Sequence, residues 1–141
     1  MKALDLVCPH VASGDGDGEG PVLMGSRCAD CSELYFPPAA NCTRCLSRTL
    51  QPAEIGNRGT LWSWTVQAFL PKTPYDGGET PESFVPYGVG YVEMPSGIKI
   101  EARLASADVT RLHIGMPMRL ALAPYGVNGR HTFIFEPEAD A

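Results

Sequence analysis

Hydrophobic and polar residues alternate along the second half of the chain, the pattern typical of half-buried β-strands. Alternation predicts strands at 60–70, 87–94, 98–104, 118–122 and 131–136. In the first of these we expect Trp62, Trp64 and Val66 to share one face. A single helical turn is expected at 106–112, between the third and fourth strands. Five strands with such a connection predict a Greek-key barrel of the OB type, in a mainly β protein.

The first part of the chain has a different composition. Residues 13–20 alternate glycine with acidic side chains, so we expect 1–20 to be a flexible N-terminal segment. A calcium loop is disfavoured there because the flanking helices and the twelfth-position glutamate are missing. The predicted organisation is this flexible segment, a small module at 21–53, an OB domain at 54–137 and a tail at 138–141.

Four cysteines give the module at 21–53 its chemistry. They are Cys28, Cys31, Cys42 and Cys45, and they form two C-x-x-C units separated by ten residues. This spacing directs four thiolates at one tetrahedral metal ion, so the sequence predicts a rubredoxin-like zinc ribbon with structural Zn²⁺. Two disulfides or four unconnected thiols would not account for two paired C-x-x-C units. Iron remains an alternative to zinc, because it binds the same tetrahedral set of four sulfurs.

Charge narrows the choice of partners. The 141 residues carry a formal net charge of −5 with a pI near 5.1, which argues against a surface built for phosphate backbones. The N-terminus does not read as a signal peptide, and no stretch is long enough to span a membrane. We therefore expect a cytoplasmic protein.

A long proline-rich stretch at 71–86 separates the first two predicted strands. Its aromatic residues Tyr75 and Phe84, and Tyr87 just after it, either cap the barrel or contact a ligand. Candidate catalytic groups are sparse. Cys8 and His10 are separated by a proline and have no evident third group to orient them, and His113 and His131 each stand alone at a strand end. The sequence therefore predicts a non-catalytic protein.

Several short motifs together resemble the zinc-ribbon OB-fold proteins associated with acyl-CoA thiolases. The resemblance covers about Val22 to Phe135, and its motifs are Arg27-Cys28-Ala29-Asp30-Cys31, Tyr35-Phe36-Pro37-Pro38, Cys42-Thr43-Arg44-Cys45, Gly59-Thr60-Leu61-Trp62-Ser63-Trp64-Thr65-Val66, Pro86-Tyr87 and Ile114-Gly115-Met116-Pro117-Met118. Many members carry a helical hairpin before the ribbon, whereas this chain has only a short apolar run there.

The resemblance implies a subunit that completes the acyl-CoA pocket of a thiolase-fold catalytic partner, in a heterotetramer acting on CoA thioesters. One family setting is an aromatic acylsuccinyl-CoA thiolase such as the 2-benzoylsuccinyl-CoA enzyme. On this view the candidate CoA contacts are Lys72, Tyr75, Phe84, Tyr87, Arg103 and Arg119. The alternatives are single-stranded nucleic-acid binding by the OB barrel, and electron transfer by an iron-containing ribbon.

Overall fold

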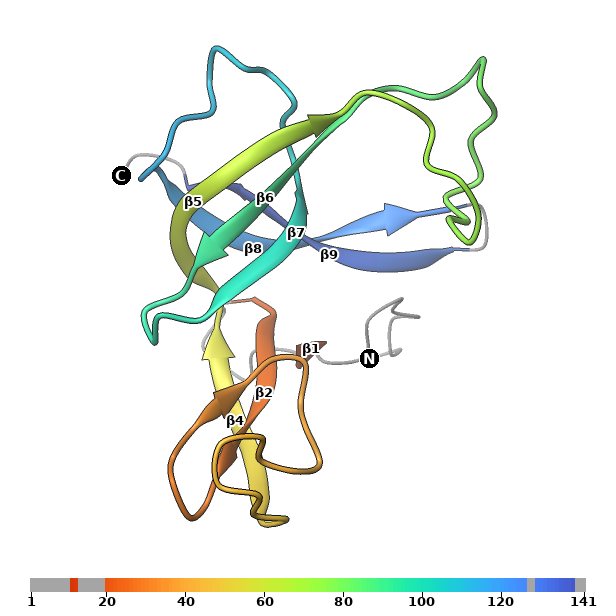
Figure 1. Ribbon diagram of the computed structural model, residues 1–141. Helices are drawn as coiled ribbons and strands as arrows, with labels where there is room; N and C mark the ends of the chain where they lie inside the picture. The colour runs from red at the N-terminus through yellow and green to blue at the C-terminus, as the bar shows by residue number, and fades with distance from the viewer. Residues whose placement is uncertain (1–10, 13–19, 127–128, 139–141) are drawn as a thin grey trace.

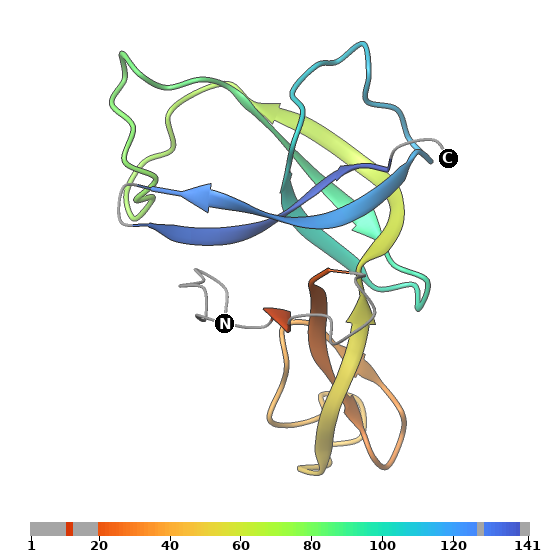
Figure 2. The same ribbon diagram turned by 180° about the vertical axis from the view of Figure 1, so that it is seen from behind.

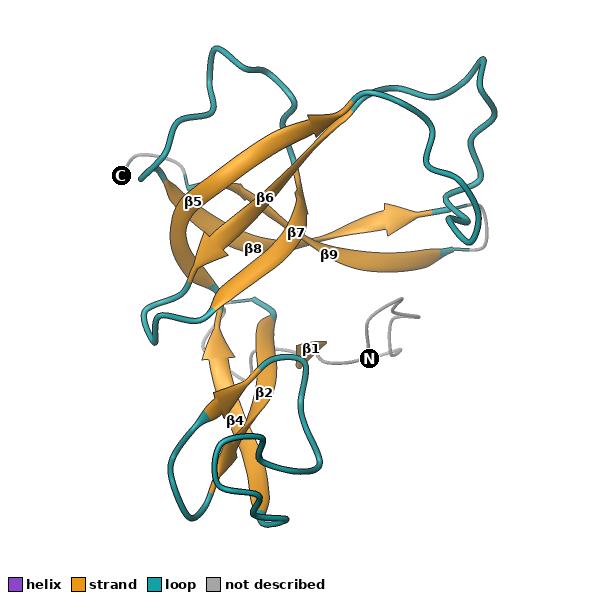
Figure 3. Cartoon of the chain, viewed as in Figure 1, coloured by secondary structure: helices purple, strands orange, loops and turns teal. Residues whose placement is uncertain are grey.

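The computed structural model describes residues 11–12, 20–126 and 129–138 as two β-structures joined end to end (Figure 1). A four-stranded sheet forms the N-terminal part, and a closed five-stranded barrel forms the C-terminal part. Within these residues there is no helix, and hence none that is long and apolar enough to cross a membrane (Figure 3).

The N-terminal sheet is built around β2 (Val22–Cys28). This strand pairs antiparallel with β1 (Val11–Ala12), β3 (Leu34–Tyr35) and β4 (Leu50–Gly56). The pairing of Val11 and Ala12 with β2 differs from the flexible segment that the sequence predicts at 1–20. The remainder of that segment, apart from Gly20, lies outside the described residues.

The barrel has the strand order of an OB fold. Its strands are β5 (Arg58–Gln67), β6 (Tyr87–Glu93), β7 (Lys99–Leu104), β8 (Pro117–Tyr125) and β9 (Arg130–Pro137). They close in the order β5-β6-β7-β9-β8, with β7 and β9 parallel and every other pair antiparallel. This confirms the predicted five-stranded barrel after an N-terminal zinc ribbon.

The segment between β7 and β8 is a turn and not a helix. The backbone N–H groups of Arg111 and Leu112 both donate to the carbonyl of Asp108, and the helical pattern goes no further. The Asp108 carboxylate also accepts from the Thr110 N–H at 2.9 Å, which favours a turn over a longer helix.

A β-bulge in β5 changes which residues face the core. Leu61 pairs with Val92, but Ser63 rather than Trp62 pairs with Tyr91. The extra residue leaves Leu61 buried and Trp62 51% exposed, while Trp64 packs against the core. The prediction that Trp62 and Trp64 share one face is therefore wrong, because a period of two does not survive a bulge.

The ribbon packs against one end of the barrel. Figures 1 and 2 show β4 running into β5 with the N-terminal sheet below the barrel. Leu23 on β2 and Ile55 on β4 belong to the same buried cluster as the barrel core. Phe36 also contacts Phe133 of β9 edge to face, with ring centroids 6.1 Å apart. Hydrophobic contact therefore joins the two parts into one core.

A double-mutant cycle on Phe36 and Phe133 tests this contact. We expect Phe36→Leu and Phe133→Leu together to destabilise the zinc-loaded protein by about 0.5–1.5 kcal/mol less than the sum of the single changes, the value typical of an aromatic pair. Urea unfolding measures the three free energies. Strict additivity would contradict the contact, and Pro38→Ala, an exposed neighbour, should leave stability unchanged.

Candidate functional site

Two turns of the same design present the four cysteines. In each turn the first cysteine's N–H donates to the carbonyl five residues later, and its own carbonyl accepts the N–H four residues later. The pairs are Cys28 with Glu33 and Ser32, and Cys42 with Ser47 and Leu46, at 2.8 Å and 3.0 Å in both cases. Ser32 and Leu46 both have a φ of 67°, a left-handed conformation that turns the backbone around the sulfurs.

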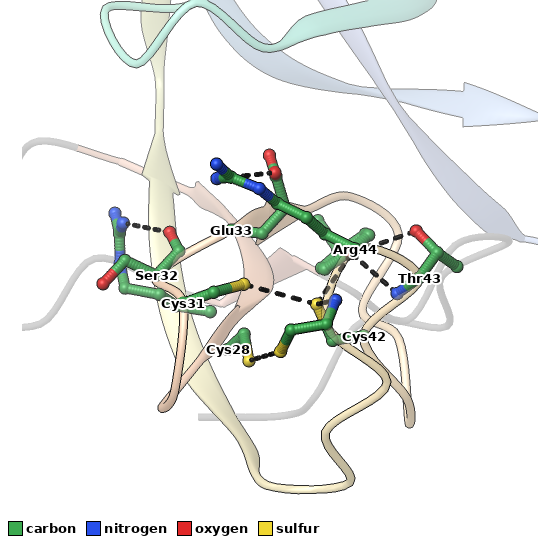
Figure 4. A network of polar contacts seen from close by, with 10 residues as sticks. Cys28, Cys31, Ser32, Glu33, Cys42, Thr43 and Arg44 are labelled. Atoms are coloured by element: carbon green, nitrogen blue, oxygen red, sulfur yellow. Dashed lines mark hydrogen bonds and ion pairs between the residues drawn. The ribbon is translucent and has the colours of Figure 1, made fainter.

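The four sulfurs lie at the spacing that a tetrahedral metal ion requires. The Sγ atoms of Cys28 and Cys45 are 3.5 Å apart, as are those of Cys31 and Cys42, and all four lie within 4.8 Å of one another (Figure 4). Zinc–sulfur bonds in a tetrahedron separate sulfurs by about 3.8 Å. None of the four is in a disulfide. The residues present fit a four-thiolate zinc site.

Tyr35 on β3 adds an outer hydrogen bond to this centre. Its hydroxyl lies 3.2 Å from the Cys42 sulfur and accepts the N–H of Thr43 at 2.9 Å. The Tyr35 hydroxyl, with smaller contributions from the amides of Cys45 and Arg44, lowers the pKa of Cys42 to about 6. The lowered pKa favours the thiolate of Cys42, the form that binds zinc.

The other cysteine pKa values diverge because the thiols share hydrogen bonds. The amide of Cys31 is the main group that lowers the pKa of Cys28. The Ser47 amide lowers the pKa of Cys45, but the neighbouring thiols of Cys28, Cys31 and Cys42, together with partial desolvation, outweigh that amide and raise the pKa to about 12. Four thiolates this close repel one another, so all four can be ionised together only when a metal cation lies between them.

A second group of side chains gathers where β5, β6 and β7 meet the loop 68–86. Four of the six predicted CoA contacts meet here: Tyr75, Phe84, Tyr87 and Arg103. The Arg103 guanidinium stacks 3.7 Å above the centroid of Tyr87, and its Nη2 donates to the Tyr75 hydroxyl at 3.2 Å. Phe84 contacts the edge of Tyr87 at 6.0 Å. This group is the loop cluster.

The side chains of Lys72 and Arg119 do not join the loop cluster in the described contacts. Arg119 is near the start of β8, exposed, and ion-paired with Glu136 at 3.4 Å. Tyr125, at the other end of the same strand, contacts the cluster. The Lys72 side chain is exposed on the loop, and its carbonyl accepts the Tyr75 N–H. Arg119 therefore lies apart from the other predicted contacts, whereas Lys72 touches the cluster through its backbone alone.

Three residues of the loop cluster escaped the sequence analysis: Asp76, Tyr125 and Arg130. The ring of Tyr125 lies 5.8 Å from the Arg103 guanidinium and 5.2 Å from that of Arg130. Its hydroxyl donates to Asp76 at 2.9 Å, and Arg130 Nη2 donates to the same carboxylate at 3.0 Å. Tyr125, followed by Arg130, holds the pKa of Asp76 below its usual value. The only feature of the sequence that could have indicated these residues is that a tyrosine and an arginine flank the turn between β8 and β9.

The structure describes two of the three histidines, His113 and His131. His113 is exposed, whereas the Nδ1 atom of His131 is buried and has no hydrogen-bond partner among the described residues. Cys8 and His10 lie outside the described residues.

Comparison with known proteins agrees with both parts of the structure. Residues 21–51 match the ChsH2 rubredoxin-like zinc ribbon domain, and residues 53–123 match the ChsH2 C-terminal OB-fold domain. The structure is similar to that of an Ltp2-ChsH2(DUF35) aldolase, with a TM-score of 0.64 and 28% identity, covering 82% of this chain and 84% of that chain.

Two curated proteins are also similar. The benzoylsuccinyl-CoA thiolase subunit BbsA of Thauera aromatica is 31% identical over 70% of this chain and 62% of its own length. A DUF35 domain-containing scaffold protein of Methanocaldococcus jannaschii is 25% identical over 67% of this chain and 62% of its own. The matched region thus spans about three fifths of these relatives. With both of its domains matched, the chain belongs to the ChsH2 (DUF35) family of zinc-ribbon OB-fold proteins.

Proposed function

We propose that the chain is a non-catalytic, zinc-binding subunit of a cytoplasmic complex that acts on CoA thioesters. Its partner would be a thiolase-fold catalytic subunit, in a heterotetramer, and the loop cluster would help to form the acyl-CoA pocket. The observation that carries this proposal is the loop cluster itself. It places two arginines and several aromatic rings at one end of a barrel whose similar proteins include a thiolase subunit and an aldolase component.

The chemistry of CoA suits this cluster. Its phosphates require cationic hydrogen-bond donors, and its pantetheine arm requires apolar walls with a few polar groups. Arg103 and Arg130 supply the first, while Phe84 and Tyr87 supply apolar surface beside them. The acyl group handled would depend on the partner, with a bulky aromatic acyl group as one candidate.

The metal's role in this proposal is structural. Four thiolates fill a tetrahedral coordination sphere, so no position stays open for water or a carbonyl oxygen. Zinc would supply folding energy, on the order of 10 kcal/mol, to a module with few buried aliphatic side chains.

Single-stranded nucleic-acid binding receives less support. The outer face of the barrel does present Trp62 and Tyr91 edge to face with Lys99 above the indole. Acidic groups stand beside them, however, because Lys99 pairs with Glu93 at 3.6 Å and Tyr91 donates to Glu101 at 3.2 Å. Such a face repels phosphates, so a gel shift at low salt should show no complex.

Metal analysis tests the structural zinc. Purified protein should contain one zinc ion per chain and be colourless. Cys42→Ser should lose that zinc, and the ribbon should become sensitive to protease because its turns are no longer held. Cys8→Ser, outside the two C-x-x-C units, should keep full zinc content. A folded, protease-resistant ribbon without metal, or a red iron protein, would contradict this prediction.

Co-expression tests the subunit proposal. We expect a thiolase-fold protein encoded beside this chain to co-purify with it as a heterotetramer in native mass spectrometry. Thiolysis of the CoA thioester should fall at least about tenfold when the chain is omitted, because part of the pocket is missing. A partner that is fully active alone, or a chain that turns over substrate unaided, would refute the proposal.

Arg103 should matter for CoA binding in that complex. Arg103→Met should raise the KM for CoA about tenfold, the usual consequence of losing a charged hydrogen bond, with a smaller change in kcat. Arg119→Met removes the same charge at the far end of β8 and should leave KM unchanged. Equal effects of the two substitutions would show that only net charge matters.

A further inference from the structure

The Asp76 carboxylate, in the loop 68–86, accepts hydrogen bonds from side chains of two strands. The Tyr125 hydroxyl of β8 and the Arg130 Nη2 of β9 both point at it, at 2.9 Å and 3.0 Å. The Arg130 side chain is 24% exposed and that of Asp76 is 61% exposed, so a half-buried cation pairs with an anion that is largely exposed to solvent. Two converging donors of this kind form an anion site, and the chain's own loop fills it.

The loop 68–86 packs closely against the hairpin formed by β8 and β9. A Cβ placed on Gly126, which has a φ of 70°, would lie 3.4 Å from the Asp76 carbonyl oxygen. Tyr75 also packs edge to face on Tyr125, with ring centroids 6.1 Å apart. Residues 75 and 76 therefore fix the loop over Tyr125 and Arg130.

Asp76 does not satisfy this site completely. Arg130 Nε is buried and has no acceptor among the described residues. Asp76 Oδ1 accepts from the Tyr125 hydroxyl and Oδ2 accepts from Arg130 Nη2, and in this geometry neither oxygen also accepts the N–H of Nε. A phosphate group offers three oxygens and a higher charge, so one group can serve the hydroxyl, Nη2 and Nε together.

The charge around the site leads to the same ligand. Arg103 and Arg130 lie on the same tyrosine ring, and the loop places Asp76 and Glu79 nearby, with Glu79 accepting from Tyr75 at 2.8 Å. Two carboxylates offset two guanidinium groups while the loop is in place. Moving the Asp76 side chain away uncovers a local positive charge on a chain whose formal net charge is −5.

We propose that Tyr125 and Arg130 form a phosphate subsite for CoA, and that Asp76 occupies this subsite until a CoA phosphate displaces it. The inference rests on the proposed function for the identity of the ligand. It adds that this chain recognises the phosphate end of CoA, and that the loop 68–86 competes with the ligand for the same donors.

Binding to the full-length, zinc-loaded chain tests the inference. Isothermal titration with CoA and with inorganic pyrophosphate should show Asp76→Asn binding both at least about threefold more tightly than wild type, because the internal competitor has lost its charge. Arg130→Met should bind both about tenfold more weakly. Pantetheine, which lacks phosphates, should not distinguish the variants. Glu82→Gln removes a charge from an exposed position of the same loop and should match wild type.

A second variant guards against misfolding. Tyr125→Phe keeps the ring and removes only the hydroxyl that donates to Asp76, so its weaker pyrophosphate binding should come with an unchanged circular dichroism spectrum. If Asp76→Asn binds no more tightly than Glu82→Gln, Asp76 is only a structural contact and the inference is wrong. An absence of pyrophosphate and CoA binding in every variant is equally decisive against it.

The outcomes also separate this inference from the proposed function. If pyrophosphate and single-stranded oligothymidylate follow the variants but CoA does not, the anion site stands and its assignment to CoA fails. If the thiolase complex requires the chain while Asp76→Asn and Arg130→Met leave the KM for CoA unchanged, the subunit role stands and the phosphate subsite fails.

Discussion

Four thiolates converging on one metal ion are the constraint on which the N-terminal part of the molecule depends. In the described part of residues 21–51, the aliphatic side chain buried most deeply is Leu23, and it faces the barrel rather than the cysteines. Among the described residues, the buried aliphatic side chains of the ribbon are Leu23 and Ile55, and both belong to the barrel core. The two identical turns around Cys28 and Cys42 give each sulfur its direction, and the metal supplies the cohesion that a core would otherwise supply. β4 leads directly into β5, and the contacts of Leu23, Ile55 and Phe36 with the barrel core fix where the ribbon stands on the barrel.

Features encoded locally could be predicted from the sequence, and features created by pairing could not. The cysteine spacing is local, so the metal site and the ribbon followed from it. Strict alternation at 98–104 gave β7 its inward face for the same reason. Trp62 was misplaced because the β5 bulge depends on the register with β6, which no pattern within β5 reveals. Arg119 and Tyr125 share a strand but lie at opposite ends of it, and only the barrel closure shows which end meets the loop.

The loop cluster shows that the net charge of a chain does not describe the charge of each local site. An acidic protein is a poor general binder of phosphates, and that argument against nucleic acid applies to the surface as a whole. Arg103 and Arg130 are exceptions, because the aromatic rings that shield them also leave their charge incompletely solvated. A half-buried cation attracts one well-placed anion more strongly than separate lysines on the surface do, because water screens its charge less. Selectivity for a small phosphate ester therefore needs only two such groups and is compatible with a negative net charge.

The ribbon and the loop cluster lie at opposite ends of β5, and this arrangement limits how they can cooperate. The strand has ten residues, about 30 Å of extended chain, between the ribbon junction at Arg58 and the loop that follows Gln67. A ligand phosphate held by Arg130 is therefore remote from the sulfur centre. The metal cannot contact such a ligand, so it can affect binding only indirectly, by holding the ribbon in its folded form. A macromolecular partner, in contrast, can touch both ends at once. This arrangement agrees with the proposed function, in which the metal would fix one contact surface, the loop would offer another, and the reaction would take place on the partner.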